Sequence, residues 1–238
     1  MLVGTVARLF RYPVKSMRGE EISATQTDFH GVLGDRRWAF VQADDTSYFP
    51  WLTARKTAQM LLYRPRYATE PETRAREPAL SVEAPDGRVL AVDDPELRAE
   101  LERLAEAPLF LLHSFRAVPD IAPFSLFNLA LADEIGAHAG SRPDPRRFRA
   151  NIYMQPTSEP ISDAALVGRT LAIGPQLRLA VLALDQRCKM ITLDPDTAER
   201  SPALLQTVVN DFANCAGVHC AVLQPGPLAV GDAITVEE

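Results

Sequence analysis

Residues 183–195 read Ala-Leu-Asp-Gln-Arg-Cys-Lys-Met-Ile-Thr-Leu-Asp-Pro, and the rest of the chain can be organised around this stretch. The alternating apolar run before it, 177–184, predicts a strand, and residues 191–193 predict another that ends at the turn-forming residues 194–197. Cys188 therefore falls on a turn between two expected strands. A thiol at such a position is better placed to meet a ligand than one deep in a core.

Cys188 is flanked by the cations Arg187 and Lys189. Two neighbouring positive charges favour the thiolate, which is the form of cysteine that ligates a metal or attacks an electrophile. A free cysteine also packs well as a small buried hydrophobe. Local chemistry alone therefore leaves both a functional and a structural thiol open.

The composition bounds the class of protein. The chain has 238 residues, of which 47% are hydrophobic, so it can form one large all-β domain or two smaller ones with a sizeable core. Its 3 cysteines include no Cys-x-x-Cys pair, which argues for a reducing compartment and against a disulfide framework or a structural zinc site. The net charge of -6 disfavours broad nucleic-acid binding. No apolar run is long enough for a signal peptide or a membrane span, so we expect a cytoplasmic protein.

Positive charge recurs at the ends of the expected strands in residues 1–65. Each of three short segments places a cation beside a hydroxyl, a carboxylate or a turn glycine. The segments are 13–16, 34–38 and 52–55, and they contain Lys15 with Ser16, Arg36, and Arg55. Arginine can hold phosphate through two hydrogen bonds and a hydroxyl adds a donor, so these groups suit an anionic ligand. Solvated surface charge remains the alternative unless the fold brings the three segments together.

A change in the character of the sequence near residue 115 predicts two domains, 1–115 and 116–238. The first contains a hairpin around Asp86-Gly87 and a helix that begins near residue 93. The second is expected to begin with a helix over 125–137 and to end in short strands that close a barrel. In the strand expected over 146–154, Arg147, Arg149 and Asn151 would share one face and could read an anion and an amide edge.

Taken together, these segments resemble the MOSC family, the proteins related to the C-terminal domain of molybdenum cofactor sulfurase. The resemblance is to the amidoxime-reducing subgroup that carries an N-terminal β-barrel domain. It covers nearly the whole chain and rests on the order and approximate spacing of short motifs. These are 12–16, 34–38, 52–55, Asp120 with 123–124, 148–152, Arg187-Cys188 followed by 192–197, and 230–232. The chain departs from the subgroup at Ala150, at 121–122, at Asp185 and over 198–202.

The resemblance implies a fold, a cofactor and a set of site residues. The fold class is α+β and mostly β, with an N-terminal β-barrel-like domain and a MOSC β-barrel that carries peripheral helices. The cofactor is the molybdenum cofactor, molybdopterin with Mo. Cys188 would ligate molybdenum, and the cofactor-binding residues would be Lys15, Ser16, Arg36, Asp120, Arg149 and Asn151. Charge neutralisation adds Arg55 and Arg187 to this set.

The function that the resemblance implies is reduction of N-hydroxylated compounds by a molybdenum enzyme. The substrate would be a small molecule, and a separate protein would donate electrons because the chain has no ferredoxin-like cysteine cluster. No nucleic acid or membrane partner is expected. Two alternatives remain open at this point. One is a non-catalytic cofactor carrier or sulfur-delivery protein, and the other is a degenerate MOSC-fold module that binds a different ligand.

Overall fold

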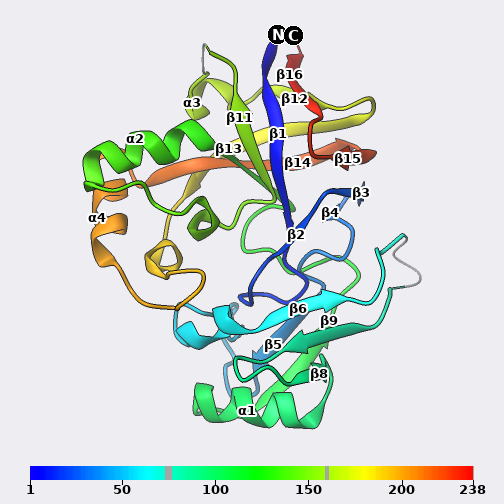
Figure 1. Ribbon diagram of the computed structural model, residues 1–238. Helices are drawn as coiled ribbons and strands as arrows, with labels where there is room; N and C mark the ends of the chain where they lie inside the picture. The colour runs from blue at the N-terminus through cyan, green and yellow to red at the C-terminus, as the bar shows by residue number, and fades with distance from the viewer. Residues whose placement is uncertain (73–76, 159–160, 238) are drawn as a thin grey trace.

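The computed structural model describes residues 1–72, 77–158 and 161–237, and it is an α+β protein made mostly of strands (Figure 1). A barrel forms the upper part of Figure 1 and holds both chain ends at its top. A smaller part below the barrel carries two short sheets and helix α1 (Pro95–Ala105). The expected fold class is confirmed.

The barrel is closed and has seven strands. Six neighbouring pairs run through one sheet, and the pairing of the first strand with β11 closes the ring. All pairs are antiparallel except β10 with β11. In order around the barrel, the strands are β11 (Ile152–Pro156), β10 (Phe124–Asn128), β14 (Cys215–Gln224), β13 (Leu177–Gln186), β12 (Thr170–Ile173), β16 (Ala233–Glu237) and β1 (Leu2–Arg11).

Alternation along the strands fills the barrel interior. In β14, Val218, Cys220 and Val222 belong to the barrel core, so His219 between them faces outward. The predicted strand over 177–184 is confirmed as β13, whose inward residues also join this core. Burying the core residues of adjacent strands against one another is what closes the sheet.

Short helices cover one side of the barrel. Helices α2 (Leu129–Ala139) and α4 (Pro202–Asp211) pack against each other, at the left of Figure 1. The other short helices of this half are α3 (Asp163–Leu166) and the 3-10 helices η2 (Pro145–Phe148) and η3 (Lys189–Thr192). Within residues 1–72, 77–158 and 161–237, no helix has the length and apolar character to cross a bilayer.

The smaller part has its own core beneath two sheets. Strands β5 (Trp38–Gln42) and β9 (Leu109–His113) form one sheet. Strands β6 (Arg64–Tyr67), β7 (Leu80–Glu83) and β8 (Val89–Ala91) form the second, and the predicted hairpin around Asp86-Gly87 is confirmed as β7–β8. A further short sheet joins β15 (Pro227–Ala229), β3 (Ala24–Asp28) and β4 (Gly31–Val32), and its residues Val32 and Leu228 belong to the barrel core. Strand β2 (Glu20–Ile22) extends β1, and η1 (Ala58–Leu62) precedes β6.

The barrel and the smaller part exchange chain segments. Strand β1 comes from the first residues of the chain and yet lies in the barrel between β11 and β16. Leu193, which follows Cys188 by five positions, is 1% exposed in the core of the smaller part. The domain boundary near residue 115 stays a prediction. Because of this exchange, the barrel and the smaller part pack against each other.

Three local predictions are wrong. Residues 125–128 are strand β10, and the helix begins only at Leu129, where the Asn128 side chain accepts a hydrogen bond from the Ala130 amide. An apolar run that is buried on all sides looks alike in a strand and a helix. Residues 191–193 do not form a strand, because Ile191 and Thr192 lie in the 3-10 helix η3 and Leu193 comes directly after it. Ile191 and Leu193 are buried in two different cores. The expected strand over 146–154 begins only at Ile152, so Arg147 lies in η2 and Arg149 directly follows it.

Candidate functional site

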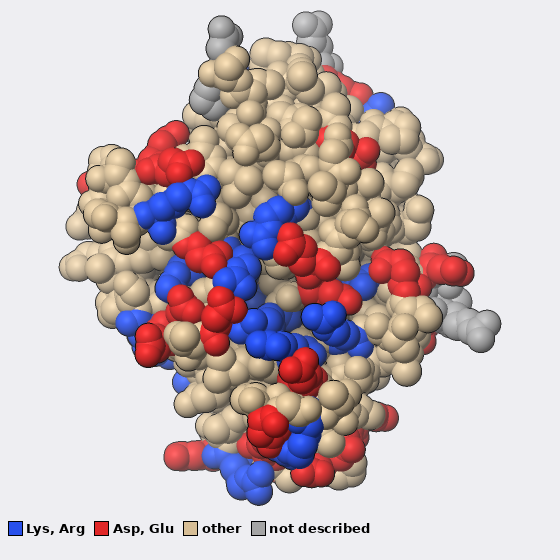
Figure 2. Space-filling model, viewed as in Figure 1, with Lys and Arg blue, Asp and Glu red and all other residues tan. Residues whose placement is uncertain are grey.

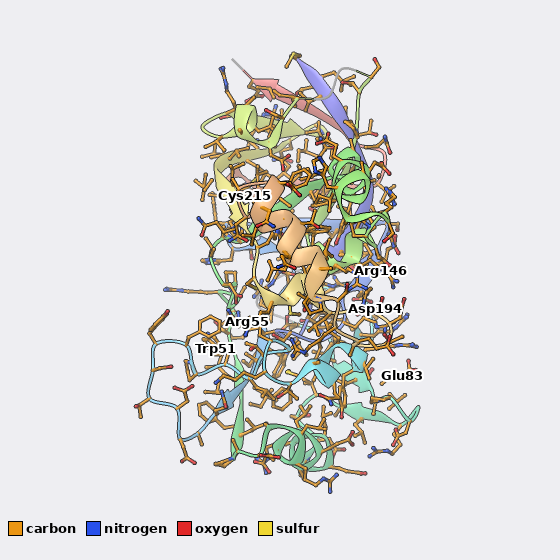
Figure 3. The ribbon with its side chains drawn as sticks, turned by 90° about the vertical axis from the view of Figure 1, so that its left-hand side faces the viewer. Trp51, Arg55, Glu83, Arg146, Asp194 and Cys215 are labelled. Carbon is orange, nitrogen blue, oxygen red and sulfur yellow. The ribbon has the colours of Figure 1, made fainter. Side chains whose placement is uncertain are left out.

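A cavity of about 560 Å³ lies between the barrel and the smaller part. We refer to it as the Cys188 cavity. It brings together every predicted site residue except Asn151, namely Lys15, Ser16, Arg36, Arg55, Asp120, Arg149, Arg187 and Cys188. Figure 3 shows Arg55 and Trp51 on the side of the molecule where this cavity lies. The three basic segments of the N-terminal half therefore meet the cysteine stretch in one place.

Cys188 sits where β13 gives way to η3. Its backbone is extended, and its side chain is exposed with a free thiol. Arg187 beside it turns inward, where its Nε donates to the Ala216 carbonyl at 2.7 Å and its Nη1 to the Phe148 carbonyl at 3.0 Å. Arg187 also pairs with Asp185 at 2.5 Å. Arg187 thereby holds the end of the strand in place and leaves the neighbouring thiol facing the cavity.

Lys15 is a buried ammonium group on the cavity wall. Its side chain is 4% exposed, and its Nζ donates to the Val118 carbonyl at 2.8 Å and to the Asp120 carboxylate. Burial lowers the pKa of Lys15, and Asp120 opposes that effect. The ammonium also lies 5.5 Å from the centre of the Phe49 ring. A cation held in this way is available to a negatively charged ligand in the cavity.

Arg36 is presented by a tight turn. Gly34 has a φ of 81° and Arg36 itself a φ of 47°, so the chain reverses here through left-handed backbone. The guanidinium of Arg36 pairs with Asp35, whose carboxylate is buried and also accepts from the Tyr12 amide at 2.7 Å. The turn and the buried carboxylate fix the direction in which Arg36 enters the cavity.

Asn151 lies behind this wall and does not line the cavity. It is 1% exposed, and its Nδ2 donates to Asp35 Oδ1 and to the Phe10 carbonyl, each at 3.2 Å. Its Oδ1 accepts from Arg36 Nη1 at 3.4 Å. Asn151 therefore positions the Asp35–Arg36 pair, and the structure assigns it no direct contact with the cavity.

Arg149 has no carboxylate partner among the described residues. It follows η2 with a φ of 53°, and its guanidinium carbon lies 4.3 Å from the centre of the Tyr12 ring. Within the described part of the chain, no oxygen accepts a hydrogen bond from that guanidinium. Burial, and after it the like charge of Arg36, lowers the pKa of Arg149. A half-buried cation without an acceptor is stabilised by an anion that enters the cavity.

Sequence reasoning missed several lining residues. Tyr48 and Phe49 lie on the loop after β5, and Tyr48 is 97% exposed. The aromatic cluster at 48–51 was the available signal. His219 of β14 also lines the cavity, with Nε2 3.3 Å from Asp185 Oδ1, although neither ring nitrogen has a hydrogen-bond partner among the described residues. No local motif marks His219, because only the barrel register places it beside Asp185.

The donor set fits an anionic metal complex better than a bare metal ion. Within residues 1–72, 77–158 and 161–237, no group of three His, Cys, Asp or Glu side chains could hold a metal. Cys188 offers a single thiol to the cavity, and the lining has six Lys or Arg residues but only two Asp or Glu residues. A metal bound to this sulfur therefore needs its other ligands from an organic group, and the cations suit one that is negatively charged.

Comparisons with known proteins agree with this arrangement. Residues 116–235 match the family model of the MOSC domain, and residues 3–109 match that of the MOSC N-terminal beta barrel domain. The chain is 23% identical to mitochondrial amidoxime-reducing component 1 of Mus musculus, in an alignment that covers 98% of this chain and 82% of the relative. Among solved structures, the YUAD protein from Bacillus subtilis superposes with a TM-score of 0.52 at 16% identity, covering 98% of this chain and 94% of that one. The last likeness concerns the fold alone.

Proposed function

This chain belongs to the MOSC family, and we propose that it is a molybdenum cofactor-dependent reductase of N-hydroxylated compounds in which Cys188 ligates molybdenum. The observation that carries the proposal is the guanidinium of Arg149, which has no hydrogen-bond acceptor among the described residues and lines the same cavity as the exposed thiol of Cys188. The alignment with a relative named for amidoxime reduction supports the reaction class.

The chain's own residues divide into two groups around such a cofactor. Cys188 would hold the metal, and Lys15, Ser16, Arg36 and Arg149 would hold the pterin and its phosphate. Asp120 keeps the Lys15 ammonium in place, Asn151 keeps Arg36 in place, and Arg55 and Arg187 add positive charge to the wall. These groups offset the negative charge of the cofactor and orient it toward the mouth of the cavity.

When bound, the molybdenum centre supplies the two-electron chemistry that removes oxygen from an N–OH group. The overall reaction consumes the N-hydroxylated compound, two electrons and two protons, and it releases the N–H compound and water. A separate electron-donor protein would deliver the electrons. The protons would come from solvent, which reaches the open cavity.

The test is the molybdenum and phosphorus content of protein made in a host that synthesises the cofactor. We expect both elements in the wild type, together with reduction of a hydroxylamine or an amidoxime by an artificial donor. Cys188→Ser should lose molybdenum, whereas Cys215→Ser, a matched change at a thiol outside the cavity lining, should retain it. Unchanged molybdenum in Cys188→Ser would overturn the assigned ligand.

The same experiment separates the alternatives. Molybdenum without turnover of either substrate would indicate a carrier or sulfur-delivery protein. If the purified protein contained neither molybdenum nor phosphorus, it would be a binding module that has kept the fold without the cofactor.

A further inference from the structure

A second cavity, of about 330 Å³, adjoins the Cys188 cavity. We refer to it as the arginine cavity, because seven arginines line it: Arg8, Arg18, Arg64, Arg66, Arg146, Arg147 and Arg149. In Figure 3, Arg146 lies on one side of the molecule and Arg55 on the other. The two cavities meet only at Arg147, Arg149 and Met190, which line both.

The charge in the arginine cavity is arranged unevenly. Two glutamates are the acidic residues of its lining: Glu20 is paired with Arg11 at 2.8 Å, and Glu21 is paired with Arg8 of the same lining at 2.6 Å. The carboxylates that pair with Arg64, Arg146 and Arg147 lie outside the lining. Figure 2 shows Lys and Arg gathered in the middle of this face, interspersed with Asp and Glu.

Arg66 is the arginine of this cavity that is least engaged. It is exposed on β6, and its side chain has no carboxylate partner in the described part of the chain. Its neighbour Arg64 holds Glu83 only at 3.4 Å, and both of these side chains are more than a third exposed. Arg18 and Arg146 both pair with Asp196, and Arg146 also pairs with Asp144 at 2.7 Å. Two guanidinium groups that face one space can together bind a phosphate dianion through paired hydrogen bonds.

The remaining wall of the arginine cavity is apolar. It is formed by Phe10, Tyr12, Leu61, Pro65, Met190, Leu193 and Pro195. Such a surface accepts a planar ring, while the arginines accept the anionic group beside it. The volume suits a small ligand that carries both features.

From this geometry we propose that the arginine cavity binds an organic phosphate, a phosphate monoester attached to a planar ring such as that of a nucleoside monophosphate. This site adjoins the Cys188 cavity, with which it shares Arg147, Arg149 and Met190, but phosphate binding around Arg66 does not depend on the function proposed for the Cys188 cavity. The phosphate would contact the guanidinium groups around Arg66, and the ring would lie on the apolar wall.

The experiment measures binding of AMP to the full chain by isothermal titration calorimetry, with adenosine and inorganic phosphate as comparators. We expect AMP to bind at least about tenfold more tightly than either comparator, because each lacks one of the two recognised features. Binding should weaken as salt is added. Equal binding of AMP and adenosine, or no detectable binding of AMP, would overturn the proposal.

Matched variants locate the ligand. Arg66→Glu should weaken AMP binding by about tenfold or more, and Arg66→Gln, which removes the charge without reversing it, should weaken it in the same direction. Arg98→Glu makes the same charge change on the exposed face of α1 and should leave AMP affinity unchanged. An equal loss in Arg98→Glu would mean nonspecific attraction and would contradict a specific site.

A further variant distinguishes this site from the Cys188 cavity. Arg55 lines only that cavity, so Arg55→Glu should not change AMP affinity. If Arg55→Glu weakened AMP binding and Arg66→Glu did not change it, the ligand would lie in the Cys188 cavity and the proposal would be overturned. Cys188→Ser should bind AMP as the wild type does, so that loss of molybdenum and loss of AMP binding report on the two proposals separately.

Discussion

The Lys15 ammonium group and the Asp120 carboxylate form an ion pair across 105 positions of the sequence, at the wall of the Cys188 cavity. Lys15 follows the first barrel strand, and Asp120 lies on the loop before β10. The Lys15 side chain is 4% exposed and that of Asp120 is 55% exposed, so the pair joins a buried cation to a carboxylate at the cavity surface.

This pair predicts a pH dependence of stability. Burial alone would raise the pKa of Asp120, but Lys15 together with the charges of Arg36 and Arg55 holds the pKa below its ordinary value. A carboxylate with a depressed pKa stabilises the fold above its ordinary pKa of about 4, and this contribution is lost as the pH falls through the depressed value. Asp120→Asn should therefore lower the free energy of unfolding at pH 7 by about 1 kcal/mol, a value reduced by solvent screening of the exposed carboxylate.

Urea denaturation of the wild type and Asp120→Asn between pH 7 and pH 2.5 checks this prediction. The difference between the two should shrink as the wild-type carboxylate becomes protonated. A difference that stays constant over the whole range would show that the charge of Asp120 is not the cause.

Arg149→Met should separate ligand binding from folding. The guanidinium has no acceptor among the described residues, so its removal should change the free energy of unfolding by no more than about 1 kcal/mol. Cofactor retention should fall at least about tenfold, measured as molybdenum and phosphorus per chain, because a cation facing the anionic ligand is lost. Arg149→Lys keeps the charge and should retain more cofactor than Arg149→Met. A methionine variant that holds the cofactor normally would contradict the role of Arg149.

Asn151→Ala should act mainly on the fold. It removes the donor that reaches Asp35 and the Phe10 carbonyl, both in a buried setting, and so it should cost about 2 kcal/mol of unfolding free energy. Arg55→Ala is the contrasting change, because Arg55 lines the cavity beside Phe49 and should cost less than about 1 kcal/mol. Equal costs in urea denaturation would contradict the assignment of Asn151 to the support of the cavity wall.

Asp185→Asn should destabilise the end of β13. Asp185 and Arg187 are both less than a tenth exposed, and the substitution leaves the guanidinium with only carbonyl acceptors. We expect a loss of about 2 kcal/mol. The control is Asp133→Asn, which breaks an exposed pair with Arg142 and should cost less than about 0.5 kcal/mol. Thermal or urea unfolding of both variants gives the comparison.

The three thiols should differ in reactivity. Burial raises the pKa of Cys220 to about 12, and burial together with Asp185 raises that of Cys215. Cys188 is exposed. Iodoacetamide at pH 8 should therefore alkylate Cys188 first in the folded, cofactor-free protein and leave Cys220 unmodified, as peptide mass mapping would show. Early modification of Cys220 would mean that the barrel core opens.

Much of the candidate site could be predicted from sequence. The short motifs around Lys15, Arg36, Arg149 and Cys188 marked residues that line one cavity, and a cation beside a hydroxyl or a turn glycine was the local signal. Asn151 was predicted from a strand face shared with Arg147 and Arg149 and from the family resemblance, and it lies behind the cavity wall. A motif names the residues of a site, whereas the direction of each side chain depends on the backbone that carries it. Arg147 and Arg149 share the cavity through a 3-10 turn, although a strand face was expected.

The sequence by itself determined the elements whose pattern is local, such as the alternating strand β13 and the hairpin around Asp86-Gly87, and the family to which the chain belongs. Only the tertiary structure decided that residues 125–128 form a barrel strand, that β1 crosses into the barrel, and that His219 stands beside Asp185. Alternation and turn chemistry act between near neighbours in the chain. Pairing of distant strands and burial of distant side chains depend on the free energy of the whole packed core, which no short stretch of sequence contains.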